Sequence, residues 1–192
     1  IDNIINYPGL IQNGTPLSAA QTNITIQNIG ILSNGSTILS RNNGFLCHRY
    51  FGNSINNGTL LIDNCYSTGK MKQVSTGGLC GAFYGYRSSG GILTIQNCYS
   101  TGEKIGGGNG GIFAFGYGNL ASGGIFTVNN CYSTGAMTGD GAAGIFASRY
   151  GRQASGGTFK VNNCYSTGAI SGRSSGGICS NYYGELLPSN SI

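Results

Sequence analysis

A repeated hexapeptide with fixed spacing is the feature that most restricts how this chain can fold. Asn-Cys-Tyr-Ser-Thr-Gly occurs four times, and its cysteines are 33 residues apart each time. The copies are Asn64–Gly69, Asn97–Gly102, Asn130–Gly135 and Asn163–Gly168. A period of roughly 20–50 residues indicates a repeat architecture, in which each unit packs mainly against its neighbours.

Other positions follow the same register. A glycine and an apolar residue recur at Gly78-Leu79, Gly111-Ile112, Gly144-Ile145 and Gly177-Ile178, and a tyrosine–glycine pair recurs at Tyr84-Gly85, Tyr117-Gly118, Tyr150-Gly151 and Tyr183-Gly184. A degenerate copy containing Cys47 precedes them, with three extra residues near its start. We therefore expect a single domain with five repeats over residues 28–184, an N-terminal cap over residues 1–27 and a C-terminal tail or cap over residues 185–192.

Each unit contains three short segments that alternate apolar and polar residues, separated by Gly, Ser and Asn. This pattern is typical of strands and turns. The chain contains 36 glycines, which weaken helix interiors. Similar strands at a fixed period stack most simply as parallel ladders, so the prediction is an all-β, single-domain parallel β-helix (β-solenoid). The spacing leaves open whether one repeat makes one coil or two.

The alternation also predicts which side chains point inward. In the segment 93–96, the apolar residues Leu93 and Ile95 should face the interior. If the alternation continues past the asparagine, Cys98 and Ser100 point inward and Tyr99 points outward. A bend at the asparagine could break this pattern.

A contact face follows from this orientation. It consists of the outward columns Tyr66, Tyr99, Tyr132, Tyr165, Thr68, Thr101, Thr134 and Thr167. Exposed apolar stripes with polar rims mark contact surfaces, and tyrosine suits interfaces because its ring is buried while its hydroxyl stays hydrogen-bonded. The alternative is that the stacked rings stabilise the sheet through cross-strand pairing.

The cysteines are predicted to be structural. Cys65, Cys98, Cys131 and Cys164 should form a ladder of buried, reduced thiols that pack as small apolar groups. Cys47 and Cys80 share another column in adjacent units and are the best disulfide candidate. One histidine, His48, and no Cys-x-x-Cys motif offer no ligand set, so we expect neither a metal nor a cofactor.

The segment Gly-Gly-Ile-Phe-Ala-Phe followed by Asn-Cys-Tyr-Ser-Thr-Gly resembles the GLUG-type repeat. Residues 64–184 match this pattern in four units and residues 28–63 match it loosely, although some turns are longer, as at 86–91. The resemblance implies a solenoid in a surface or adhesin-like protein and transfers no catalytic residue. Similar Gly/Asn-rich arrays also resemble surface proteins of large DNA viruses.

Charge argues against catalysis and against nucleic acid. The acidic residues are Asp2, Asp63, Glu103, Asp140 and Glu185, and no two share a column in adjacent units. General acid–base chemistry needs positioned pairs, so no catalytic residue is predicted. The net charge is +5, but the ten basic residues are scattered with no run longer than Lys70-Met71-Lys72, so we expect no nucleic-acid partner. No apolar run is long enough to span a membrane.

The sequence therefore predicts a non-enzymatic structural or adhesive surface module of a virion, a cell envelope or a secreted assembly. Its partners would be copies of itself, other coat or wall proteins, or glycans. A second hypothesis is an ice-binding solenoid that uses the Tyr-x-Thr face, although bulky Tyr and the neighbouring Lys160 disfavour it. A third is a carbohydrate-active β-helix enzyme, which the missing carboxylate pairs disfavour.

Overall fold

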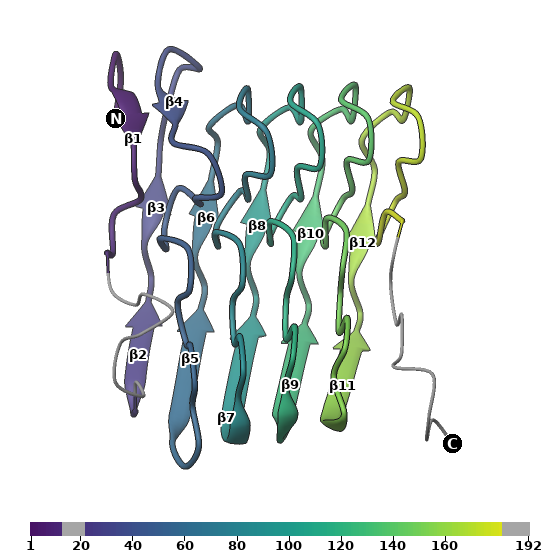
Figure 1. The fold of residues 1–192 in the computed structure, drawn as a ribbon. Helices are drawn as coiled ribbons and strands as arrows, with labels where there is room; N and C mark the ends of the chain where they lie inside the picture. Colours follow the sequence, from purple (N-terminus) through teal and green to yellow (C-terminus); the bar gives the residue numbers. More distant parts are fainter. Residues whose placement is uncertain (13–21, 182–192) are drawn as a thin grey trace.

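The computed structural model describes residues 1–12 and 22–181. Parallel strands form a stack of coils, and no helix occurs in these two ranges (Figure 1). The prediction of an all-β parallel β-solenoid is therefore confirmed. The predicted C-terminal tail of residues 185–192, the pair Tyr183-Gly184 and residues 13–21 of the predicted N-terminal cap lie outside the described residues.

Two five-stranded parallel sheets run along the stack. The first has the order β11-β9-β7-β5-β2 and the second the order β12-β10-β8-β6-β3. The first sheet contains β2 (Ile24–Gln27), β5 (Thr59–Asp63), β7 (Ser89–Gln96), β9 (Ser122–Asn129) and β11 (Gly156–Asn162). The second contains β3 (Gly30–Ile31), β6 (Tyr66–Ser67), β8 (Tyr99–Ser100), β10 (Tyr132–Ser133) and β12 (Tyr165–Ser166). A separate parallel pair joins β1 (Ile5–Tyr7) to β4 (Ile38–Leu39).

The strand register shows that each 33-residue repeat makes one coil. Ile62 is opposite Ile95, and Ile95 is opposite Val128. In the first coil the offset is 36, because Ile26 is opposite Ile62, which accounts for the three extra residues of the degenerate copy. At the N-terminal end, β1 and a bridge from Ile11 to Cys47 continue the columns by part of another coil.

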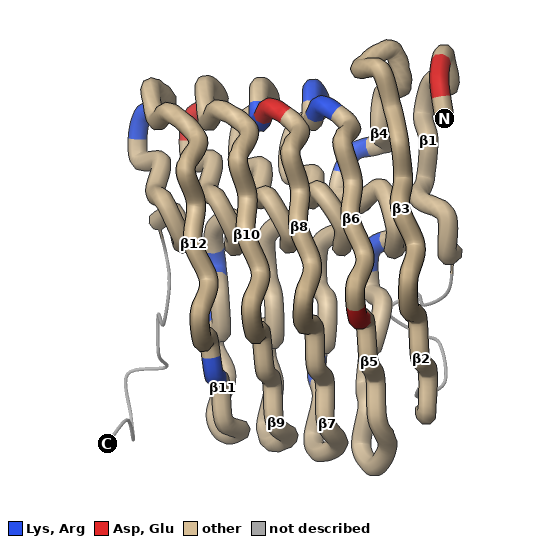
Figure 2. The backbone as a smooth tube through the Cα atoms, turned by 180° about the vertical axis from the view of Figure 1, so that it is seen from behind, with Lys and Arg blue, Asp and Glu red and all other residues tan. Residues whose placement is uncertain are grey.

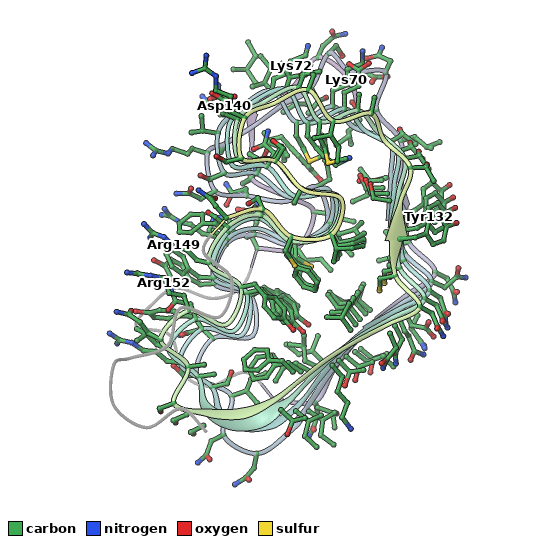
Figure 3. All side chains as sticks on the ribbon, turned by 90° about the vertical axis from the view of Figure 1, so that its right-hand side faces the viewer. Lys70, Lys72, Tyr132, Asp140, Arg149 and Arg152 are labelled. Atoms are coloured by element: carbon green, nitrogen blue, oxygen red, sulfur yellow. The ribbon has the colours of Figure 1, made fainter. Side chains whose placement is uncertain are left out.

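The Gly-apolar segment differs from the prediction, because it forms single bridges rather than a third regular strand. Gly77, Gly110 and Ala143 make such bridges in successive coils. The amides of Leu79 and Cys80 both donate to the carbonyl of Ile112, which interrupts a regular ladder. This segment is buried and turns into the interior of each coil (Figure 3). Its close backbone packing explains the glycines.

A left-handed asparagine makes the corner between the two sheets. Asn64, Asn97 and Asn130 have φ of 50°, 54° and 50°, and asparagine tolerates this conformation better than most residues. The preceding residue and the asparagine both face outward, so the extra outward residue resets the alternation. Cys98 is consequently buried and Tyr99 faces out. These orientations agree with the prediction, although the alternation is broken at the asparagine and does not continue past it.

Inward columns fill the space between the sheets. Leu60, Leu93 and Phe126 form one apolar column, which the first sheet contributes. An aromatic column crosses the interior, where Tyr84 and Tyr117 stack with their ring centroids 5.7 Å apart. In the last described coil the inward positions are less covered, since Val161 is 38% exposed whereas Val128 is fully buried.

Candidate functional site

The predicted contact face lies on the second sheet. The rings of Tyr66, Tyr99, Tyr132 and Tyr165 form one continuous stack. Successive centroids are 4.8, 4.9 and 5.1 Å apart, with interplanar angles of 1°, 6° and 4°. Figure 3 shows the labelled Tyr132 pointing away from the interior. The fixed parallel register places each tyrosine directly opposite the next, which allows this stacking.

Stacking decides which atoms the tyrosines present to solvent. Tyr99 has a ring on either side, and Tyr66 packs over Gly30, where any side chain would collide with its ring. Ring edges and hydroxyls therefore line the face, while ring planes are largely covered. Tyr165, the last tyrosine of the stack, is 52% exposed. Burial, followed by the neighbouring phenols, raises the pKa of Tyr99, so its hydroxyl stays a neutral donor and acceptor.

Amides and threonines flank this stack. The side-chain amide of Asn64 donates to Asn28 (2.7 Å), and that of Asn130 donates to Asn97 (3.2 Å). The predicted threonines follow on the other side; Thr68 is half-buried, and Thr101, Thr134 and Thr167 are exposed. The strands between these columns carry no charged residue, so the face is uncharged along the second sheet (Figure 2).

The predicted cysteine ladder is present as free thiols. Cys65, Cys98 and Cys131 are buried, and Cys164 in the last coil is half-buried. Each thiol donates a hydrogen bond to the carbonyl two residues before it, at 3.0–3.2 Å. A thiol must carry its proton in order to donate to a carbonyl, so these hydrogen bonds favour the neutral form of the cysteines. Cys47 and Cys80 are paired in the predicted column but are also free thiols, so the candidate disulfide is not formed.

Thiol accessibility should follow burial. At neutral pH and without denaturant, we expect iodoacetamide to modify Cys164 and Cys179, since the other five thiols are buried. Burial also raises the pKa of Cys80 well above its ordinary value, which further suppresses its reactivity. Peptide mass spectrometry after brief alkylation would check this. Modification of Cys98 or Cys131 as fast as Cys164 would contradict the buried ladder.

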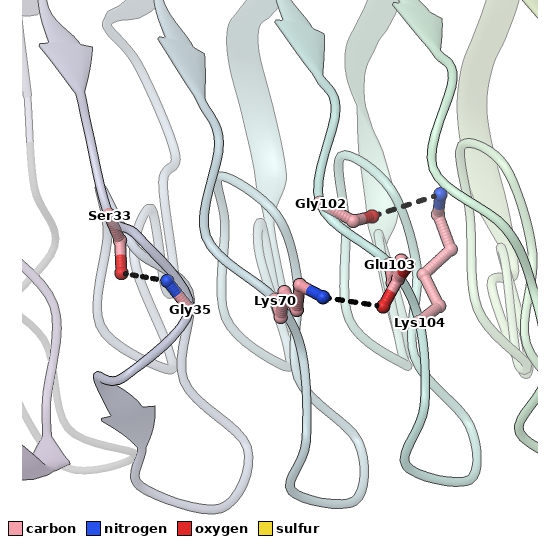
Figure 4. Close-up of polar contacts among 6 residues, drawn as sticks. All are labelled: Ser33, Gly35, Lys70, Gly102, Glu103 and Lys104. Atoms are coloured by element: carbon pink, nitrogen blue, oxygen red, sulfur yellow. Dashed lines mark hydrogen bonds and ion pairs between the residues drawn. The ribbon is translucent and has the colours of Figure 1, made fainter.

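A buried lysine was missed by the sequence reasoning. Lys104 occupies an inward column between Met71 and Met137, and its side chain is fully buried. Its ammonium donates to the carbonyls of Gly135 (2.7 Å) and Gly102 (3.5 Å), the second of which Figure 4 shows. Burial lowers its pKa to about 8. The 33-residue register already aligned this lysine with two methionines, which was the available signal.

The ion pair between Lys70 and Glu103, next to Lys104 in the chain, lies on the surface. Lys70 Nζ lies 3.0 Å from Glu103 Oε2, and both side chains are more than 40% exposed (Figure 4). An exposed pair of this kind contributes little to stability, typically about 0–1 kcal/mol. Asp63 lies on β5 and accepts a hydrogen bond from the Asn97 amide. These carboxylates are committed to separate polar contacts.

The turns on the opposite side from the tyrosine stack gather arginines and aromatic rings. Arg49 lies over Tyr50, Arg87 over Tyr86 and Arg149 over Phe115, with guanidinium carbons 5.0–5.9 Å from the ring centroids. We call these six residues the arginine face. The basic residues are thus less scattered than the sequence indicated, because the 33-residue coil brings turns from different repeats together. Figure 3 labels Arg149 on this side.

Residues 1–12 and 22–181 contain no group of three or more His, Cys, Asp or Glu that could hold a metal ion. The same ranges contain no helix capable of crossing a membrane. No protein-family model, curated protein or solved structure matches the chain.

Proposed function

We propose that this chain is a non-enzymatic structural or adhesive surface module of a virion, a cell envelope or a secreted assembly. The observation that carries the proposal is the uncharged tyrosine stack of the second sheet. It offers a regular row of phenol edges beside amide and threonine columns. Such a row can contact a repetitive partner at several equivalent points. The partner would be a second copy, another coat or wall protein, or a neutral glycan.

The chemistry of the row favours contact rather than turnover. Neutral hydroxyls and amides donate and accept hydrogen bonds without moving a proton, and the stacked rings add apolar area that an interface can bury. The backbone pairing of every coil holds these groups in fixed positions, which reduces the entropy lost on binding. The resemblance of the repeat to GLUG-type sequences is what points to a surface setting.

Removing the centre of the stack tests the proposal. In the double variant Tyr99→Thr/Tyr132→Thr, threonine keeps strand propensity while two rings are lost. Two interface tyrosines contribute roughly 1–2 kcal/mol each, so we expect self-association or binding to neutral glycans to weaken about 30- to 700-fold. Sedimentation analysis and a glycan array would measure this.

The control removes exposed apolar groups from the first sheet in the same two coils. Ile92 and Ile125 are 46% and 40% exposed on β7 and β9, and the variant Ile92→Thr/Ile125→Thr should bind like the wild type. Thermal unfolding of both variants separates lost contact from lost folding. A wild-type chain that stays monomeric and binds neither a glycan nor a co-assembling protein would overturn the proposal. Equal loss in the two variants would do the same.

A further inference from the structure

We propose that the arginine face is a binding site for an acidic polysaccharide, a linear polymer carrying sulfate or carboxylate groups. This inference is independent of the role proposed for the tyrosine stack, because it uses the turns on the other side of the coils. Its first support is charge. The turns 48–54, 81–87, 114–120 and 147–153 contain four arginines and one histidine and no acidic residue.

The described carboxylates lie elsewhere and have partners of their own. Asp2 accepts from the backbone amide of Asn34, and Asp63 accepts from the side-chain amide of Asn97. Glu103 pairs with Lys70, and Asp140 accepts from the backbone amide of Arg173. Asp140 lies at the neighbouring corner of the coil, apart from Arg149 in Figure 3. The positive charge of the arginine face is therefore available to an external anion.

Contacts with aromatic rings restrict the positions of the three guanidinium groups. Each of the three lies over an aromatic ring, and the rings support one another: Tyr50 stacks on Phe83 with centroids 4.9 Å apart. Phe83 also meets Phe115 edge to face at 4.7 Å. A planar guanidinium resting on a ring keeps its N–H groups at the edge, where they can donate in pairs to sulfate or carboxylate.

Backbone hydrogen bonds between coils keep these turns in register. The amide of Tyr50 donates to Ala82 (2.8 Å), and that of Phe83 donates to Phe115 (2.9 Å). Arg87 likewise donates to Asn119 (3.0 Å). The side chains thus project from a ladder rather than from independent loops, which lowers the ordering cost of binding.

The backbone conformation of the face adds a second argument. Tyr50, Phe83 and Arg149 have φ of 63°, 62° and 67°, and they occupy one column in which the intervening coil has Gly116. A left-handed conformation costs a non-glycine residue about 1 kcal/mol. Large side chains at positions where glycine is unstrained are most easily explained by a use for those side chains.

The arrangement fits a linear polyanion better than a single-stranded nucleic acid. The arginines come from the first, second and fourth coils of the array, so they span three coil spacings, or about 14 Å along the stack. Single-stranded nucleic acids bind largely by stacking bases on open aromatic rings. Here an arginine already lies over each of the rings Tyr50, Tyr86 and Phe115, so the site presents N–H donors instead.

The test compares two triple variants with the same net charge. Arg49→Gln/Arg87→Gln/Arg149→Gln neutralises the arginine face, and Lys72→Gln/Lys160→Gln/Arg173→Gln neutralises three exposed basic residues elsewhere. The probes are heparin and polygalacturonate, which separate sulfate from carboxylate, with dextran as the neutral polymer and poly(dT) as the nucleic acid. Calorimetry or biolayer interferometry in 150 mM NaCl gives the affinities.

We expect the first variant to bind heparin or polygalacturonate at least tenfold more weakly than the wild type, and the control variant to lose less than threefold. The variant Tyr99→Thr/Tyr132→Thr should bind these polymers normally, so this inference and the proposed function can fail separately. Equal losses in the two triple variants would overturn the site, because they would indicate a net-charge effect. Binding to dextran of similar strength, tighter binding to poly(dT), or no binding to either acidic polymer would also overturn it.

Discussion

Replacing Gly111 by alanine should destabilise the solenoid by about 3 kcal/mol or more, the upper end of the usual cost of overpacking. The added Cβ would collide with the carbonyl oxygen of Gly144 and lie 2.6 Å from the Ser133 hydroxyl. A backbone carbonyl cannot rotate away as a flexible side chain can. Urea denaturation followed by circular dichroism would show the midpoint moving to lower concentration.

Gly177 supplies a matched control for this prediction. It occupies the same column in the last described coil, and apart from residues 176–178 no atom of the described chain lies within 4 Å of the position of its Cβ. Gly177→Ala should therefore change stability by less than about 0.5 kcal/mol. If the free energy of unfolding of Gly111→Ala also lies within about 0.5 kcal/mol of the wild-type value, the interior segments are not stacked as closely as described here.

Replacing Lys104 by methionine should stabilise the protein at pH 7 by up to about 3 kcal/mol, the free energy that corresponds to the shift in the pKa of this lysine. Methionine already occupies this inward column in the two adjacent coils, as Met71 and Met137, so the variant continues the column with a third methionine. Burial lowers the pKa of Lys104 to about 8, against about 10.4 in an unfolded chain. At pH 7 both states are protonated, so the folded protein bears the full cost of burying the ammonium. Thermal or urea unfolding of both proteins measures the gain.

The pH dependence has a defined sign. Between pH 8 and about 10.4 the unfolded chain binds more protons at this position than the folded one, so the wild type gains stability there as the pH rises. The advantage of Lys104→Met should therefore be constant below pH 8 and shrink towards pH 10. Comparing the two proteins at each pH cancels other titrations, including those of the buried tyrosines.

The exposed Lys72 provides the control for this pair of measurements. Lys72→Met removes the same charge and adds the same side chain on the surface, so its stability should stay within about 0.5 kcal/mol of the wild type. A destabilised Lys104→Met variant would show that the hydrogen bond to Gly135 outweighs the cost of burial. An advantage that does not change with pH would indicate that its cause is packing rather than charge.

Much of the architecture was accessible from the order of residues. The inward positions of Leu93 and Ile95 followed from simple alternation, and the shared column of Cys47 and Cys80 followed from the period. The burial of Cys98 was predicted, but it depends on two consecutive outward residues, Gln96 and Asn97, which shift the alternation by one position. The number of coils per repeat did not follow, because the spacing of one unit is compatible with one long coil or two short ones. Only the pairing of Ile62 with Ile95 resolved it.

Two features depended on contacts that no local pattern contains. The tyrosine column was predicted, but whether its rings stack face to face depends on the exact parallel register of β6, β8, β10 and β12. The arginine face was not predicted, because Arg49, Arg87 and Arg149 do not share one column and are separated by 38 and 62 residues in the chain. They approach one another only because the turns stack.

The sequence by itself determined the solenoid, since a strict 33-residue period with alternating polarity leaves stacked parallel strands as the simplest way to bury every unit. The tertiary structure decided what the surfaces offer. How each coil turns inward at its glycines, and which turn residues adopt left-handed conformations, depends on packing between coils. That packing buries Lys104, covers the ring planes of the tyrosine stack and brings the arginines to one face.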